Sequence, residues 1–482
     1  MVIEMIKTTY TQKIVACAMT VAAAMGLASC SDSYPGLEYN GDNTVIQNNE
    51  SYDKTPIMVF INPQNFFSIT ATRSGGTGPF TDLSNKKYEK SIFYVFAFRG
   101  TKDEPGHGSL SYEPDLSKTR FTENLPHDDE ADNCLVDGKD YDFGYPAKLT
   151  RDYPGAFDFK DKDYVSGDLQ DKDDPGEDGT LSAQLYYSTL HQDVGYNFFA
   201  YHIDNLDETA VSNRRQNTSE IAYDLTIDGT QDIMCGYAPA LTSDVLDPQN
   251  LRMSPEERQN ILNIGLYSTF AAHRGVNPTV EMTHQLVRLD FKAYPGDEEV
   301  ERITITGVEV EAPDKGTLVV ANANPHAASG NYRSIGYHPD YESMTYIPLK
   351  GKSVDGEECG EFECVDGIGW WKEAYKGMAY SEREFKPVGG SIMIPEQETY
   401  NIRLHFNQKD KDGNDLGDFH ANYNVKLSNG SFQKGYNYTI SIVVYGLKPI
   451  SVTANIENWI PSDDDIIVND DKDPSDVDIS ND

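Results

Sequence analysis

The chain has 482 residues, with 78 acidic side chains against 40 basic ones and a formal net charge of −38 at pH 7. Proteins that bind nucleic acid or anionic lipid headgroups need a basic surface, so this composition excludes both as expected partners. The length exceeds that of one ordinary domain, and two or three domains are expected.

Residues 1–29 have the pattern of a lipoprotein signal peptide. Lysines precede an apolar run from Ile14 to Leu27, and the segment closes with the letters LASC. This run is too short for a transmembrane helix, which needs about 20 apolar residues. Small residues before Cys30 suit a signal peptidase, and acyl chains on that cysteine, palmitate among them, would anchor the mature chain. We therefore expect an exported precursor that is held on the outer membrane through Cys30, with residues 30–51 as a flexible tether.

The remaining chain is predicted to be all-β with few short helices. Its 30 tyrosines and 20 phenylalanines, with frequent glycines and prolines, accompany many short segments of strand character. Strand-like segments include residues 91–100 and 194–204, and from His284 to Phe291 polar and apolar residues alternate so that one face is apolar. A helix is expected in SPEERQNILNIGL, where Ser254 can cap the amino end and Pro255 suits the first turn.

Changes in composition divide the chain into predicted domains. Residues 52–277 form the first, with an acidic insertion at about 101–180 that is rich in Asp, Gly and Pro. The second domain covers residues 278–461, and an acidic tail occupies residues 462–482.

Cysteine spacing indicates a disulfide more than a metal site. Cys359 and Cys364, in the stretch CGEFEC, can close a local disulfide in an oxidising compartment. A zinc site is the poorer interpretation, because no second close cysteine pair and no His-x-x-x-His spacing accompanies this one. No metal and no cofactor are expected.

Motifs of catalysis and of calcium binding find little support. The sequence has no nucleophile elbow, no His-Glu-x-x-His and no glycine-rich phosphate loop beside a helix, so an enzyme is not expected. The stretch from Asp410 to Asp418, DKDGNDLGD, lacks the glycine and the glutamate of an EF-hand loop. A hairpin turn at Asp412 and Gly413 is the better interpretation.

Several motifs, taken in order, resemble the fimbrillin family, whose members are the major and accessory subunits of the type V pili of Bacteroidales. They are LASC, SIFYVFAF, VGYNFFAYHID, DIMCGYA, MTHQLVRLDFKAYPG with ITITGVEV, and the closing GYNYTISIVVYGLKPISVTANIENW. The resemblance runs from Cys30 to about Val468. It implies two tandem transthyretin-like β-sandwich domains with Greek-key-type strands, export as a lipoprotein and removal of an N-terminal segment by an arginine-specific protease.

Cleavage of this kind would open a groove that a strand of the next subunit fills, because an unpaired sheet edge pairs readily with another chain. Arg73 and Ser74 flank our candidate for the cleaved bond. Strand-like segments stop at Arg73, a pair of glycines follows Ser74, and no other arginine lies between Cys30 and Arg99. The alternative is an ordinary arginine at the end of a strand.

The donor strand is expected near the C-terminus, in a segment with five apolar candidates: Trp459, Ile460, Ile466, Ile467 and Val468. Pro461 and three aspartates interrupt this segment. An interrupted donor strand fits a tip or accessory subunit, which accepts a strand without having to donate one.

The expected function is therefore a structural or tip/accessory subunit of a cell-surface fimbrium that serves adhesion. Its expected partners are other pilus subunits, the protease, and a host or bacterial surface receptor or glycan. The alternative is a surface-anchored glycan-binding lipoprotein, because exposed aromatic rings stack on sugars and one stretch gathers four of them: Trp370, Trp371, Tyr375 and Tyr380. A place in a domain core or an inter-domain contact explains the same rings.

Overall fold

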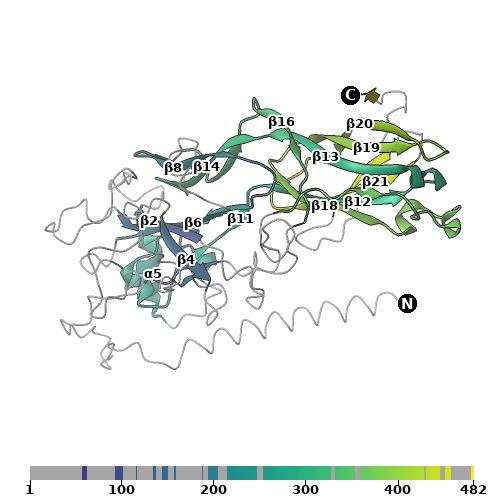
Figure 1. Ribbon diagram of the computed structural model, residues 1–482. Coiled ribbons are helices and arrows are strands. Elements are labelled where there is room, and N and C mark those ends of the chain that lie inside the picture. The colour runs from purple at the N-terminus through teal and green to yellow at the C-terminus, as the bar shows by residue number, and fades with distance from the viewer. Residues whose placement is uncertain are drawn as a thin grey trace, which may run out of the picture. The chain divides into compact units, whose positions relative to one another are not determined.

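The computed structural model describes residues 57–61, 93–100, 116, 134–136, 144–149, 157–158, 187, 194–204, 214–246, 253–326, 332–352, 359–427, 430–445, 451–456 and 479–481. Strands predominate among them and the helices are few and short, so the all-β prediction is confirmed (Figure 1). The signal peptide, Cys30, the Arg73–Ser74 bond and the segment from Trp459 to Val468 lie outside the described residues.

By its internal contacts the chain divides into two compact units. The first unit takes Leu185–Gly195, Ala240–Asn277 and the chain up to Ile57. Its described helices are α4 (Ser243–Leu246), α5 (Pro255–Ile264) and α6 (Thr269–Ala272).

Helix α5 is the predicted helix, and its ends follow from local chemistry. Ser254 Oγ accepts a hydrogen bond from Glu257 N at 3.2 Å, while the Glu257 carboxylate accepts one from Ser254 N at 2.7 Å. This reciprocal pair satisfies two amide groups that the first helical turn leaves without partners. At the other end, Gly265 adopts φ +71°, which glycine reaches without strain, and the helix stops.

The second unit contains two β-sandwiches. In the first sandwich, one sheet has the order β11 (Thr283–His284), β9 (Ile233–Tyr237), β6 (Tyr196–Ile203), β2 (Phe93–Arg99), β4 (Tyr145–Leu149) and β5 (Phe157–Asp158), with β3 (Cys134–Val136) also on β2. The facing sheet has the order β15 (Gly336–Pro339), β14 (Lys315–Asn322), β8 (Glu220–Thr226) and β7 (Arg214–Gln216). Both sheets contribute to one core, whose largest members include Phe96, Phe98, Phe199, Tyr201 and Tyr223.

The second sandwich also pairs two sheets. One has the order β18 (Lys386–Ile394), β12 (Val287–Pro295), β21 (Asn437–Val444) and β22 (Ser451–Ile456). The other has the order β16 (Met344–Pro348), β13 (Ile303–Pro313), β19 (Thr399–Lys409), β20 (Asp415–Lys426) and β23 (Ile479–Asn481), with β17 (Val365–Asp366) on β13. Alternate residues of β19 point into the shared core, as the period of a strand requires: Tyr400, Ile402, Leu404 and Phe406.

Short elements complete the described fold. Strands β1 (Phe60–Ile61) and β10 (Thr279–Val280) form a separate two-stranded pair. The 3-10 helices are η4 (Glu298–Arg302), η5 (Glu373–Tyr375) and η6 (Tyr380–Glu382). In the part of the chain that the structure describes, no helix is long and apolar enough to span a membrane.

Strands from both sides of the predicted domain boundary build the first sandwich. β14 and β15 follow that boundary in the sequence, yet β14 pairs with β8 along its length, with Lys315 opposite Thr226 and Asn322 opposite Glu220. Strands β3, β4 and β5 fall inside the segment expected to be an insertion, and β3 and β4 both pair with β2. The domain limits themselves stay a prediction.

The hairpin predicted at Asp412 and Gly413 is confirmed. β19 and β20 pair in antiparallel fashion on either side of it, with His405 opposite His420. Asp410 Oδ1 accepts hydrogen bonds from the amides of Asp412 and Asn414, each at 2.8 Å. The carboxylate of Asp410, the first residue of the suspected calcium loop, therefore stabilises the turn itself.

Candidate functional site at the β10 edge

The segment that precedes Arg73 in the sequence takes part in the fold through β1. β1 pairs in parallel with β10, with Phe60 opposite Thr279 and Ile61 opposite Val280. The amide of Phe60 donates to the carbonyl oxygen of Pro278 at 2.9 Å. Just before this pair, the side chains of Ile57 and Val59 are buried, with exposures of 1% and 0%. The N-terminal segment thus contributes a short edge pairing and two buried apolar side chains.

The β10 edge, which we define as Pro278–Val280, is fixed by the backbone that follows it. The amide of Glu281 donates to Tyr237 O at 3.1 Å, and that of Gln285 donates to Ile233 O at 2.8 Å. A Cβ on Gly236 would lie 2.0 Å from the carbonyl oxygen of Glu281, so β9 accepts this close approach only with glycine there. The segment that follows the β10 edge is therefore held against β9 by contacts that do not involve β1.

A chain of buried polar side chains ties the ends of β6, β9 and β11 together. His284 Nδ1 lies 2.8 Å from Asp232 Oδ1, and the amide of Asp232 donates to Asp204 Oδ2 at 3.2 Å. Asp204 Oδ1 in turn lies 3.1 Å from His202 Nε2. Buried carboxylates are tolerated only with such partners. The network therefore stabilises the strands that carry the β10 edge.

The C-terminal part of the chain supplies two more edge strands. β22 pairs with β21, with Ser451 opposite Val443 and Ile456 opposite Tyr438. The short strand β23 pairs with β20 between Phe419 and Ala421. The predicted donor segment lies between β22 and β23 in the sequence, outside the described residues, so its donor role stays a prediction. The same holds for lipidation of Cys30 and for cleavage after Arg73.

The two cysteines of the predicted disulfide lie in the described loop before β17. Cys359 is half-buried and Cys364 is exposed. Their pairing stays a prediction.

Two of the four aromatic rings proposed for sugar stacking are enclosed, and the other two, Trp371 and Tyr380, are half-buried. Trp370 and Tyr375 have exposures of only 5% and 6%, and Trp370 belongs to the core of the second sandwich. The indole Nε1 of Trp370 donates to Glu384 O at 3.2 Å. Trp371 packs edge-on against Tyr375 with 5.8 Å between ring centroids. A core position is thus confirmed for Trp370 and Tyr375, and these two rings offer no stacking surface.

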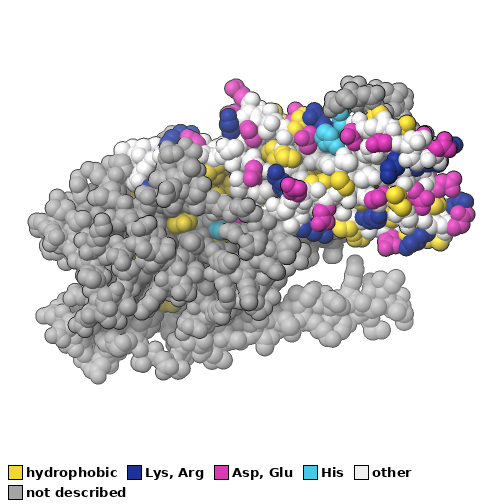
Figure 2. Space-filling model, in the orientation of Figure 1, with side chains coloured by type: hydrophobic (Ala, Val, Ile, Leu, Met, Phe, Trp, Pro, Cys, Tyr) yellow, Lys and Arg dark blue, Asp and Glu magenta, His cyan; other side chains and the backbone are white. Residues whose placement is uncertain are grey.

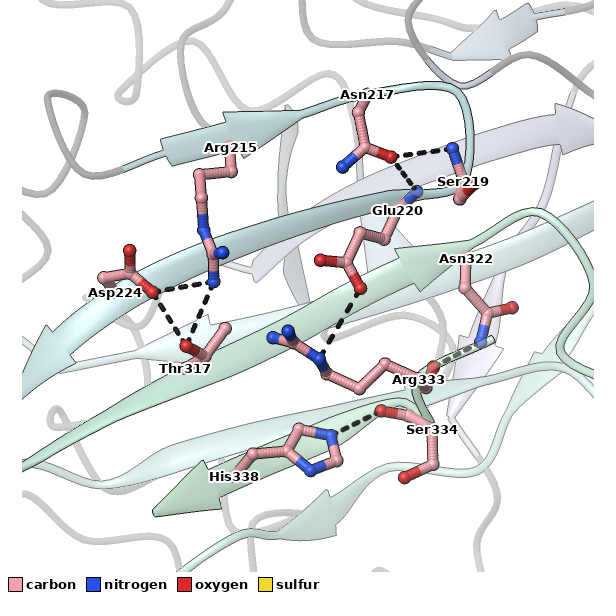
Figure 3. Close-up of polar contacts among 10 residues, drawn as sticks. All are labelled: Arg215, Asn217, Ser219, Glu220, Asp224, Thr317, Asn322, Arg333, Ser334 and His338. Carbon is pink, nitrogen blue, oxygen red and sulfur yellow. Dashed lines mark hydrogen bonds and ion pairs between the residues drawn. The ribbon is translucent and has the colours of Figure 1, made fainter. Parts of the chain in front are cut away.

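The outer face of the β7, β8, β14 and β15 sheet carries a polar network that the sequence did not indicate (Figure 3). Arg215 Nη2 donates to Asp224 Oδ1 at 2.8 Å and to Thr317 Oγ1 at 3.1 Å, and Thr317 Oγ1 donates to Asp224 at 2.7 Å. Arg333 Nε lies 3.8 Å from a Glu220 oxygen. Thr317 and Arg333 lie about a hundred residues from their partners Arg215 and Glu220, so no local motif indicates the network.

The charges of this protein are mixed over its described surface. Figure 2 shows acidic and basic side chains interspersed with single apolar ones over the second sandwich. Within the described ranges, no three side chains of His, Cys, Asp or Glu lie together so as to hold a metal ion.

Comparison with known proteins identifies one family. The family model described as fimbrillin-like matches residues 174–459, which is more than half of the chain. No curated protein matches this chain. Three solved structures illustrate the structural similarity: a candidate cell adhesion protein from Bacteroides uniformis (10% identity, 84% of this chain and 99% of that one, TM-score 0.37), a fimbrial protein from Bacteroides vulgatus (10%, 78% and 96%, 0.35) and the fimbrial anchor protein Mfa2 from Porphyromonas gingivalis (9%, 82% and 97%, 0.28).

Proposed function

The chain belongs to the fimbrillin-like family, and from this premise we propose that it is a structural or tip/accessory subunit of a cell-surface fimbrium that serves adhesion. In this proposal the chain is exported as a lipoprotein on Cys30, cut by an arginine-specific protease after Arg73, and joined to other subunits by donor-strand exchange. Whether the chain is a stalk subunit or a tip subunit depends on whether the donor segment, which Pro461 interrupts, can serve as a donor strand.

The observation that carries the proposal is the pairing of β1 with β10. Among the described residues, Phe60 and Ile61 of β1 pair with Thr279 and Val280 of β10. Removal of the segment up to Arg73 would take away β1 and the buried side chain of Val59 together. The β10 edge would then present unpaired backbone groups beside an apolar vacancy, and such an edge binds an extended strand of another chain.

Strand exchange of this kind has a clear physical basis. Main-chain hydrogen bonds give affinity to any extended segment, while side chains at every second position select the register. The residue that follows the β10 edge, Glu281, is held against β9 by contacts with Tyr237 and Gly236 that do not involve β1. A preformed acceptor of this type loses little conformational entropy when the new strand binds.

The proposal is tested by cutting the lipidated protein, purified from cells in detergent, with an arginine-specific protease. We expect a new N-terminus at Ser74, read by intact mass and N-terminal sequencing, and a ladder of multimers on unboiled gels. Trimmed protein that stays monomeric would contradict strand exchange, and a first cut elsewhere would contradict the assignment of Arg73.

A matched variant separates the cut from the charge. Arg73→Lys keeps the positive charge and the length of the side chain but is not a substrate for an arginine-specific protease. It should remain an uncut monomer with that enzyme, and trypsin, which also cuts after lysine, should restore cleavage at the same bond. Multimers from the uncut variant would show that assembly does not depend on this cut.

The alternative function, a glycan-binding lipoprotein that stays anchored through Cys30, predicts the opposite behaviour on the gel. Such a protein would remain monomeric after trimming. Trp370 and Tyr375, two of the four rings that had favoured it, are enclosed and offer no stacking surface.

A further inference from the structure

A pocket of about 380 Å³ opens on the outer face of the second sandwich, on the sheet that contains β13, β19 and β20. Figure 2 shows histidine side chains at the surface over β13 and β19, beside apolar and acidic ones. The volume lies within the range of small-molecule sites, about 300–1,000 Å³. The residues that the argument uses are Gly307, Glu309, Phe362, His405, Asp418 and His420.

The pocket exists because one row of the sheet lacks a side chain. Gly307 lies opposite His405, and His405 lies opposite His420 on the next strand. The register of β13 shifts between Ile305 and Gly307, which marks a β-bulge. Bulges redirect side chains and are frequent beside functional sites. Backbone at Gly307 therefore forms the floor, and the two imidazoles, whose ring centroids are 6.0 Å apart, form one wall.

Polar groups in the pocket are oriented in advance by their neighbours. Glu309 Oε2 lies 3.1 Å from His405 Nε2 and accepts a hydrogen bond from Arg403 Nη1 at 3.3 Å. Asp418 Oδ1 accepts a hydrogen bond from Asn407 Nδ2 at 3.1 Å. The side chains of His405 and Glu309 keep exposures of 35% and 27%, so a ligand from solvent can reach them. Groups held in this way lose little freedom when a ligand binds.

The chemistry of the lining selects a class of ligand. The two carboxylates, those of Glu309 and Asp418, outnumber the one nearby guanidinium, that of Arg403. Their combined charge is therefore negative and repels anions. Carboxylates accept hydrogen bonds, imidazoles donate and accept them, and together they suit vicinal hydroxyl groups. Pro348, Leu349 and the half-buried Phe362 add an apolar wall for C–H groups. A small neutral molecule with many hydroxyls and an apolar ring face matches this combination.

We propose that this pocket binds one neutral saccharide residue, which would be the contact of the subunit with a surface glycan. The inference rests on the adhesive role proposed above and supplies its ligand class. It places sugar recognition on the His405 face of the second sandwich, away from the enclosed rings of Trp370 and Tyr375.

The probes are the methyl glycosides of galactose, glucose, mannose, N-acetylglucosamine and N-acetylgalactosamine, with the methyl glycoside of sialic acid for comparison. Saturation-transfer NMR on the full-length protein, followed by titration, should detect millimolar binding of at least one neutral glycoside and none of the sialoside. Replacement of His405 by alanine should weaken binding about tenfold, the ratio expected when one oriented hydrogen-bond partner is lost. Gly307→Val should abolish binding, because its side chain fills the floor.

Two control variants keep the result interpretable. His338→Ala changes a half-buried histidine on the outer face of the first sandwich, where the ring bonds to Ser334 O at 2.7 Å, and should leave glycoside binding unchanged. Gly307→Ala adds a Cβ that lies 3.6 Å from the His405 ring, an ordinary contact, so it should fold and show that position 307 tolerates a side chain.

The inference is overturned if no neutral glycoside binds, if only the sialoside binds, or if binding persists in both His405→Ala and Gly307→Val. The same variants are tested for multimers after the cut at Arg73. Multimers without glycoside binding would refute the pocket and leave the fimbrial proposal intact. Glycoside binding that is lost in the two variants, in a protein that never forms multimers, would support the pocket and refute the fimbrial proposal.

Discussion

The carbonyl oxygen of Glu281 lies 2.0 Å from the point that a Cβ would occupy on Gly236. The two residues belong to the segment after β10 and to β9, so the Gly236→Ala variant must move one backbone against the other. Overpacking of this kind costs about 1–3 kcal/mol. We expect a lower urea midpoint and, because the β10 edge shifts, fewer multimers after proteolysis. Gly360→Ala is the control, since the nearest heavy atom to its Cβ is 3.8 Å away.

The capping box of α5 gives a local prediction. Ser254→Ala removes the hydroxyl that accepts from Glu257 N, and such caps contribute about 1 kcal/mol. Hydrogen exchange of the α5 amides should become about fivefold faster, because 1 kcal/mol corresponds to that factor in an equilibrium constant. Gln259→Ala, in the same helix, should change the exchange rates little. Equal effects of the two variants would contradict the role of the cap.

Glu257 predicts how this helix responds to acid. The amide of Ser254, and after it the Ser254 side chain and the Arg274 guanidinium, lower the pKa of Glu257 below its ordinary value of 4.5. Because the pKa of Glu257 is lower in the folded state than in the unfolded state, its ionised carboxylate stabilises the fold fully above pH 4.5. That stability is lost as the pH falls through the lowered pKa. Glu257→Gln should therefore reduce the loss of α5 protection between neutral and acidic pH. If α5 loses as much protection between neutral and acidic pH in Glu257→Gln as in the unchanged protein, this assignment is contradicted.

Thiol chemistry should distinguish Cys235 from Cys364. Burial raises the pKa of the Cys235 thiol to about 12, and its exposure is 1%. The thiolate is the reactive form, so Cys235 should resist iodoacetamide until the protein unfolds. Peptide mapping should find Cys364 labelled in the folded protein after reduction. If Cys364 is labelled equally without reductant, the predicted disulfide with Cys359 is absent.

The network in Figure 3 should contribute little to stability despite its short distances. The side chains of Arg215 and Asp224 have exposures of 45% and 51%, and exposed ion pairs contribute about 0–1 kcal/mol. Asp224→Asn should therefore shift the thermal midpoint only slightly, and high salt should reduce the shift further. A large loss of stability would show that this face is covered in solution.

Local signals explain what the sequence could predict. Ser254 and Pro255 mark the start of α5 by groups within one turn, and Gly413 marks the hairpin between β19 and β20. The apolar side of the 284–291 run is likewise confirmed for Val287, Leu289 and Phe291, which lie in the core of the second sandwich. In each case the residues that decide the structure are neighbours in the sequence.

Long-range packing explains which features the sequence could not predict. Leu286 and Val287 are adjacent, yet Leu286 packs in the core of the first sandwich and Val287 in that of the second. The pattern of apolar residues in the sequence does not indicate that the run passes from one core to the other. The pocket beside His405 was missed for the same reason, because Gly307, His405 and His420 meet only once three strands are in register.

The position of β14 has a consequence for the order in which the protein folds. During synthesis the ribosome makes β2, β6, β8 and β9 well before β14, which ends at Asn322. Leu318 and Val320 of that late strand belong to the core of the first sandwich, so this core stays incomplete until the chain has been made past Asn322. Pairings between distant segments slow folding and leave apolar faces open to other chains in the meantime. A nascent chain that stalls before β14 is therefore expected to aggregate.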